Sequence, residues 1–110
     1  MKVKSADAKP QKKIINREKK VKSGFEDYLK KEGYKEYTAK GAKSTVFKYS
    51  DSIEFVMQLE GISSWKEVAD KIDYLCSRYD VGGAREAEGA KSKNTVICAL
   101  KRFKEFIATI

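Results

Sequence analysis

Apolar residues recur at three- and four-residue spacing in four stretches of the chain, which is the period of amphipathic helices. The first stretch is predicted to begin at Ser23, which forms a capping-box pattern with Glu26, and to end at Gly33, where glycine favours a left-handed stop. A polar connection with several lysines follows over residues 34–43. The apolar side of this first helix is expected to consist of Phe25, Tyr28 and Leu29.

The second predicted helix spans residues 44–60 and ends at Gly61. At about 100° per residue, its apolar side chains fall on two sides. A helix that is apolar on two sides is typical of a central position in a bundle. The alternative is that the smaller side, Phe55 and Leu59, faces a partner. The longer stripe consists of Val46, Tyr49, Ile53, Val56 and Met57.

Two further helices are predicted in the second half of the chain. One begins at a second capping box, Ser64 with Glu67, and runs to Tyr79, and the other runs from about Lys93 to the last residue. Residues 80–92 between them hold three glycines and no periodicity, which predicts an exposed loop. No stretch alternates with the two-residue period of a strand. The pattern therefore predicts an all-α protein organised as a four-helix bundle.

The positive charge of the chain is concentrated at its beginning. The net charge is +8 at pH 7, yet residues 1–24 hold nine Lys/Arg against two acidic residues, and residues 25–110 hold fifteen against fourteen. We therefore divide the chain into a basic, flexible arm, residues 1–22, and a nearly neutral helical domain, residues 23–110. The arm is either a disordered solvating tail or a segment that becomes ordered against a polyanion.

The composition argues against most catalytic and metal chemistry. The chain has two cysteines, Cys76 and Cys98, and no histidine, so a tetrahedral zinc site and a histidine general base both lack their side chains. No phosphate-binding glycine loop or paired-carboxylate motif is present. We expect a protein that is not an enzyme and uses neither metal nor cofactor. Without a long apolar run or a signal-peptide pattern, we expect it in the cytoplasm, with no membrane partner.

Two predicted helix starts share one pattern, a lysine and short hydrogen-bonding side chains before a buried valine. One covers residues 43–46 and the other residues 93–96. Ser, Thr and Asn are ordinary helix caps, and this role alone accounts for the pattern. The same groups beside free backbone amides and a positive helix end also suit a phosphate clamp. The sequence leaves both interpretations open.

Two stretches resemble the core-binding, SAM-like N-terminal domain of tyrosine recombinases and phage integrases: FEDYLKKEGYKEYTAKGAKSTVFKYSDSIEFVMQL and GAKSKNTVICALKRFKEFI. In that family an F-x-x-Y-L helix precedes a Ser/Thr-initiated second helix, and the last helix follows S-x-x-T-V-x-x-x-L-x-x-F-x-x-F. The resemblance covers residues 23–110. Matching positions outside the second helix, residues 44–57, are Phe25, Tyr28, Leu29, Ser92, Thr95, Val96, Leu100, Phe103 and Phe106.

The resemblance implies a four-helix domain that packs on duplex DNA as one half of a clamp in DNA integration and recombination, with no catalysis of its own. The family's catalytic half has no counterpart in this sequence. Combined with the basic arm and the two helix starts, the resemblance predicts phosphate-backbone contacts from fifteen residues. They are Lys12, Lys13, Arg17, Lys19, Lys20, Lys22, Lys43, Ser44, Thr45, Lys48, Lys91, Lys93, Asn94, Thr95 and Arg102.

Two functions therefore compete at this point. The first is a non-catalytic DNA-binding domain that holds duplex DNA through its phosphates. The second is a small phage or mobile-element protein that binds and inhibits a host or defence factor. In the second case Phe55, Leu59 and the 80–92 loop would contact the protein partner.

Overall fold

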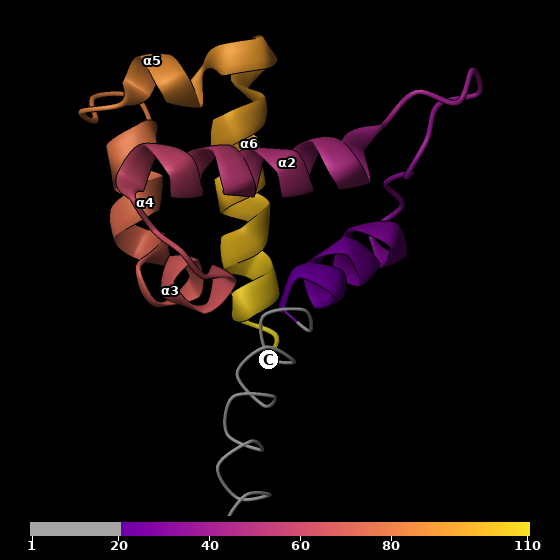
Figure 1. The fold of residues 1–110 in the computed structure, drawn as a ribbon, viewed down its shortest axis with the longest axis horizontal. Coiled ribbons are helices and arrows are strands. Elements are labelled where there is room, and N and C mark those ends of the chain that lie inside the picture. Colours follow the sequence, from indigo (N-terminus) through magenta and orange to yellow (C-terminus); the bar gives the residue numbers. More distant parts are fainter. Residues whose placement is uncertain (1–20) are drawn as a thin grey trace, which may run out of the picture.

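A computed structural model describes residues 21–110 of the chain (Figure 1). These residues are helical and contain no strand; an isolated bridge between Tyr37 and Lys43 closes the 33–44 connection. The all-α class expected from the sequence is confirmed. Residues 21–31 form the first helical segment, and the later helices are α2 (Thr45–Glu60), α3 (Trp65–Asp70), α4 (Ile72–Tyr79), α5 (Glu86–Gly89) and α6 (Lys91–Ile107).

The helix α6 is the central element of this fold. α2 lies across it, α4 runs beside it, and α3 and α5 contact it near its two ends (Figure 1). The 33–44 connection projects from the bundle at the N-terminal end of α2 (Figure 1). This arrangement places the part of α2 from Lys48 to Phe55 beside the start of α6.

An aromatic cluster fixes the first helical segment on α6. The Phe25 ring lies edge-on to that of Phe103, with 5.1 Å between centroids, and Trp65 lies edge-on to Phe103 at 5.7 Å. Phe106 completes the cluster. Phe25 and Phe103 are fully buried, and edge-to-face pairs of this kind stabilise a core beyond the area they remove from water.

Several helix ends follow the sequence pattern. Gly61 ends α2 with a left-handed φ of 68°, and Gly33 ends the first helical segment with a φ of 99°. The Ser64 hydroxyl accepts a hydrogen bond from the Glu67 amide at 3.1 Å, as the capping box predicts. The first capping box is wrong, because Val21 and Lys22 are already helical and Ser23 lies inside the helix.

The predicted helix over residues 64–79 is interrupted at Lys71, whose φ of −107° and ψ of 16° are not helical. Two short helices result, and both contact α6. Trp65 and Val68 on α3, and Leu75 on α4, are all buried. The bend therefore lets two apolar stripes turn toward one central helix, which a single straight helix would not do.

The 80–92 segment is more ordered than an exposed loop. It contains α5, and its Gly89 is buried. The segment is held by Glu60 at the end of α2, whose Oε2 accepts hydrogen bonds from Arg78 Nε at 2.9 Å, Tyr79 Oη at 2.9 Å and Arg85 Nε at 3.2 Å. This carboxylate joins α2, α4 and the chain before α5.

The start of α6 is a left-handed turn. Ser92, Lys93 and Asn94 have φ values of 55°, 59° and 70°, and regular helix begins at Thr95. Left-handed backbone costs a non-glycine residue roughly 1–2 kcal/mol. The Thr95 hydroxyl donates to the Ser92 carbonyl and the Asn94 amide donates to the Ala90 carbonyl, which holds the turn closed.

Candidate nucleic-acid interface

The described lysines and arginines fall into two groups, those with an acidic partner and those without. The helices α3 and α4, the α5 region and the second half of α6 carry paired cations: Lys66, Lys71, Arg78, Arg85, Lys101, Arg102 and Lys104. Within residues 21–110, the lysines outside any ion pair are Lys31, Lys35, Lys40, Lys48, Lys91 and Lys93. Uncompensated positive charge therefore belongs to residues 31–48 and to the start of α6.

The crossing of α2 and α6 brings part of this charge together. Lys48 and Asp51, on α2, line one hollow with Ser92 and Thr95 at the start of α6, and the volume of this hollow is about 300 Å³. Lys91 lines an adjoining hollow that shares Ser92 and Thr95. We call these four residues, Lys48, Lys91, Ser92 and Thr95, the α2–α6 junction. Of the two predicted helix starts, residues 43–46 and 93–96, only the second lines these two hollows, through Thr95 in both and Val96 in one.

The ammonium group of Lys91 lies 4.6 Å from the centroid of the Phe55 ring. Phe55 is half-buried and packs against the core, as does Leu59. The cation–π contact holds the lysine over α2 without neutralising its charge. Lys91 is therefore positioned for an anion.

Ser44 and Thr45 stand at the start of α2, which has no acidic residue in its first turn. The Ser44 side chain makes no capping hydrogen bond; its amide donates to the Glu36 carbonyl at 2.8 Å. The first turn of α6 also lacks acidic residues. No acidic side chain within these two turns neutralises the positive end of either helix dipole. Each helix start therefore favours a nearby anion.

Three of the predicted contacts carry acidic partners. Lys43 pairs with Asp51 at 3.1 Å, and Lys22 pairs with Glu54 at 2.9 Å. The Lys22 pair raises the pKa of that ammonium group, mainly through the hydrogen bond. Both pairs are partly exposed, so each is weak enough for a phosphate to compete with the carboxylate.

Arg102 is the third, and its guanidinium binds both carboxylate oxygens of Glu105 at 2.6 Å. This hydrogen bonding raises the arginine pKa further above its ordinary value. Thr95 and Arg102 are seven residues apart, about two helical turns, so they lie on the same side of α6. Arg102 therefore lies on the same face of α6 as Thr95, but Glu105 neutralises its charge.

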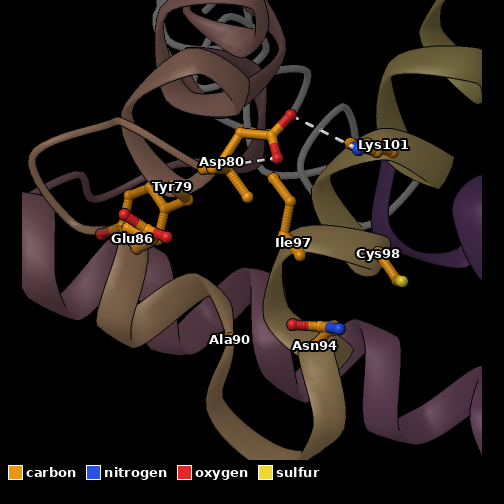
Figure 2. Close-up of a pocket in the computed structure, with 9 residues that line it drawn as sticks. Tyr79, Asp80, Glu86, Ala90, Asn94, Ile97, Cys98 and Lys101 are labelled. Carbon is orange, nitrogen blue, oxygen red and sulfur yellow. Dashed lines mark hydrogen bonds and ion pairs between the residues drawn. The ribbon is translucent and has the colours of Figure 1, made fainter.

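Asn94 lies apart from the junction. It lines another hollow, of about 270 Å³, with Tyr79, Asp80, Glu86 and Lys101 (Figure 2). Asp80 pairs with Lys101 at 3.4 Å, and the Val81 amide donates to the same carboxylate, which lowers the Asp80 pKa. Two carboxylates beside Asn94 make this hollow a poor phosphate site.

The remaining predicted contacts, Lys12, Lys13, Arg17, Lys19 and Lys20, lie outside the described residues. Three further lysines were missed by the sequence prediction: Lys31, Lys35 and Lys40, all exposed. The sequence does indicate this cluster of positive charge, because residues 31–48 hold five lysines against two glutamates. The resemblance implies contacts at the helix starts and none from the connection that precedes α2.

Two serines on α2 are buried and differ in their hydrogen bonding. Ser50 is 1% exposed and its Oγ has no partner within the described residues, whereas Ser52 Oγ donates to the Lys48 carbonyl at 2.9 Å. An unsatisfied buried hydroxyl is destabilising by about 1–3 kcal/mol. We expect Ser50→Ala to raise the free energy of unfolding by about 1 kcal/mol. Chemical denaturation checks this, with Ser52→Ala as the matched control that gains nothing.

Within residues 21–110, no group of three or more Cys, Asp or Glu side chains is arranged to hold a metal ion. No helix among the same residues is long and apolar enough to cross a membrane. Burial raises the pKa of the Cys76 thiol, so this cysteine is a poor nucleophile at neutral pH.

Comparisons of the chain with protein-family models, with curated proteins and with solved structures found no match.

Proposed function

We propose that this protein is a non-catalytic domain that binds duplex DNA mainly through the phosphate backbone. The observation that carries the proposal is the segregation of unpaired lysines onto residues 31–48 and the start of α6, while every lysine and arginine of α3 and α4 has an acidic partner. A surface that was merely solubilised by charge would not need this segregation. Clustered unpaired lysines beside two helix N-termini suit a run of phosphates.

The α2–α6 junction supplies the orientation. Lys48 and Lys91 would each approach a phosphate from a different helix, and the two helix ends add positive potential between them. The basic arm adds affinity that does not depend on sequence. This division of roles agrees with the resemblance to the core-binding domain of tyrosine recombinases, in which a helical domain forms one half of a clamp around DNA.

The alternative, a protein-interaction module, requires an exposed apolar surface on Phe55 and Leu59. Both side chains are half-buried and pack against the core. Val81, 85% exposed, is the large apolar side chain that the 80–92 segment presents. A lone valine is a smaller basis for a partner surface than the lysine cluster is for DNA.

The salt dependence of duplex binding tests the proposal. If about six phosphates are neutralised, log affinity falls against log salt with a slope near −5. Replacing Lys48 and Lys91 together with glutamine should make the slope shallower by about two. The measurement is a fluorescence-anisotropy titration of a labelled duplex at several salt concentrations.

The matched control replaces Lys66 and Lys71 with glutamine, which removes the same charge from α3 and its C-terminal end, where both lysines are paired with acidic residues. Its slope should equal that of the unmodified protein. A slope near −1 for the unmodified protein, or equal losses in the two double variants, would contradict the proposal.

A further inference from the structure

A second pocket opens beside the α2–α6 junction, at the N-terminal end of α2. It has a volume of about 350 Å³ and lies between the first helical segment, the 33–44 connection and α2. Asp51 lines this pocket and also both junction hollows, so the three adjoin one another. We call it the aromatic pocket; the residues used below are Lys22, Glu26, Tyr37, Lys43, Phe47 and Ser50.

Aromatic rings form one wall of the aromatic pocket. Tyr37 and Phe47 are in edge contact, with 5.3 Å between ring centroids. Tyr37 is 55% exposed. The ring is fixed from behind by Phe47, while the bridge to Lys43 fixes its backbone. A held, half-exposed ring offers a face on which a flat ligand can stack.

Two polar side chains of the pocket, Ser50 and Glu26, have unused hydrogen-bonding capacity. Ser50 has a buried hydroxyl without a partner among the described residues, although an unsatisfied hydroxyl is costly to keep. The half-buried carboxylate of Glu26 makes no ion pair or hydrogen bond within residues 21–110, although its charge contributes to the raised pKa of Lys22. A carboxylate of this kind accepts from an amino group. The ligand therefore needs a flat ring that carries an amino donor.

Two ammonium groups complete the pocket, those of Lys22 and Lys43. Each is held by an exchangeable, partly exposed ion pair on α2. Asp51 also lines the pocket, so together with Glu26 two carboxylates balance the two ammonium groups, and a ligand phosphate binds here only by displacing Glu54 from Lys22 or Asp51 from Lys43. An aromatic wall, a carboxylate acceptor, a free hydroxyl and nearby cations together fit a nucleotide.

We propose that the aromatic pocket receives one unstacked nucleobase bearing an exocyclic amino group, so that the protein prefers duplex DNA with a single unpaired adenine to fully paired DNA. This inference rests on the proposed duplex binding, because the α2–α6 junction holds the backbone that delivers the base. Stacking on Tyr37 and a hydrogen bond to Glu26 or Ser50 offset the energy of unstacking. Stacking of one base on an aromatic side chain is typically strong enough to change affinity about tenfold or more.

The experiment compares four duplexes of identical flanking sequence at one salt concentration. One is fully paired, one carries an extra unpaired adenine, one an extra unpaired thymine, and one an abasic residue at the same place. We expect the adenine duplex to bind about tenfold more tightly than the paired one. The abasic duplex should lose this gain although its backbone is equally distorted, and thymine, which lacks the amino group, should lose part of it.

Two variants report on the pocket itself. Tyr37→Ala should remove the preference for adenine while leaving binding of the paired duplex nearly unchanged. Tyr74→Ala is the matched control, since Tyr74 on α4 is 56% exposed and lies outside the pocket. Ser50→Ala should weaken the preference although it is expected to stabilise the fold, so a loss of binding there cannot be attributed to unfolding.

The outcomes separate this inference from the proposed function. Equal binding of the adenine and abasic duplexes, with a steep salt dependence retained, would overturn the pocket and leave backbone binding intact. A preference for adenine that survives Tyr37→Ala would also overturn it. Absence of binding to every duplex would overturn both.

Discussion

Replacing Glu60 with alanine is expected to lower the free energy of unfolding by about 3 kcal/mol. The side chain of Glu60 is 11% exposed, and one of its oxygens accepts from Arg78, Tyr79 and Arg85. The variant leaves two guanidinium groups and a buried phenol without their acceptor. Both arginines are somewhat more exposed than the glutamate, so water can partly replace it, and the loss belongs at the lower end for a buried ion pair.

Chemical denaturation gives the size of the effect. Asp73→Ala is the control, because Asp73 pairs with Lys104 at 2.9 Å but is 81% exposed, and an exposed pair contributes less than about 1 kcal/mol. If the two variants unfold at the same denaturant concentration, the Glu60 hydrogen bonds do not hold the 80–92 segment.

The same carboxylate gives the fold a dependence on pH. Burial alone would raise the pKa of Glu60, but the hydrogen bonds from Arg78 and Tyr79 and the arginine charges lower it below the ordinary value of 4.5. The charged form is therefore favoured by folding. Its contribution is complete above pH 4.5 and is lost as the pH falls through the lowered pKa.

Glu60→Gln makes this dependence measurable, since glutamine resembles the protonated acid in shape. The stability difference between the unmodified protein and Glu60→Gln should be largest near pH 7 and should shrink steadily as the pH falls toward about 3. A difference that stays constant over this range would show that the carboxylate charge contributes nothing.

The sequence predicted helix type and most helix ends because these depend on local chemistry. Gly33 and Gly61 stop helices through their own φ angles, and the Ser64 cap acts over three residues. The break at Lys71 has no such local cause. It follows from the need of α3 and α4 to face the same central helix, which is a property of the packed structure.

The candidate site shows the same division. The sequence predicted phosphate contacts from both Lys48 and Thr95, but their position on one hollow depends on how α2 crosses α6 and not on the similarity of the two helix starts. The left-handed turn at Lys93 gives no sequence signal, because the residue types there favour no such conformation except for Asn94. Apolar periodicity also missed Ser50, since a small polar residue can be buried without interrupting an apolar stripe.

Replacing Gly89 with alanine is expected to be strongly destabilising, because the added methyl group would overlap the backbone of α4. A Cβ at this position would lie 1.8 Å from the Tyr79 carbonyl oxygen and 2.9 Å from its carbonyl carbon. Both atoms belong to the backbone and cannot rotate away. The helix α5 would have to separate from the end of α4, and we expect a loss of about 3 kcal/mol in the free energy of unfolding.

Gly82→Ala is the matched control for this loss. Gly82 has a φ of +86°, and no atom lies within 4 Å of the place that an alanine methyl group would take, so alanine there meets backbone strain alone, about 1–2 kcal/mol. Thermal or chemical denaturation of the two variants should place Gly89→Ala clearly below Gly82→Ala. The reverse order would mean that α5 is free to move away from α4.

The position of Gly89 also links the fold to the proposed DNA binding. α5 contacts α6, and Lys91 follows Gly89 by only two residues, so a displaced α5 moves the left-handed turn and with it one side of the α2–α6 junction. Gly89→Ala should therefore weaken duplex binding even at temperatures where it remains folded, while Gly82→Ala should not. Glycine at this position then allows the backbone of α5 to approach the backbone of Tyr79 closely. This approach fixes the position of Lys91 and Lys93 at the start of α6.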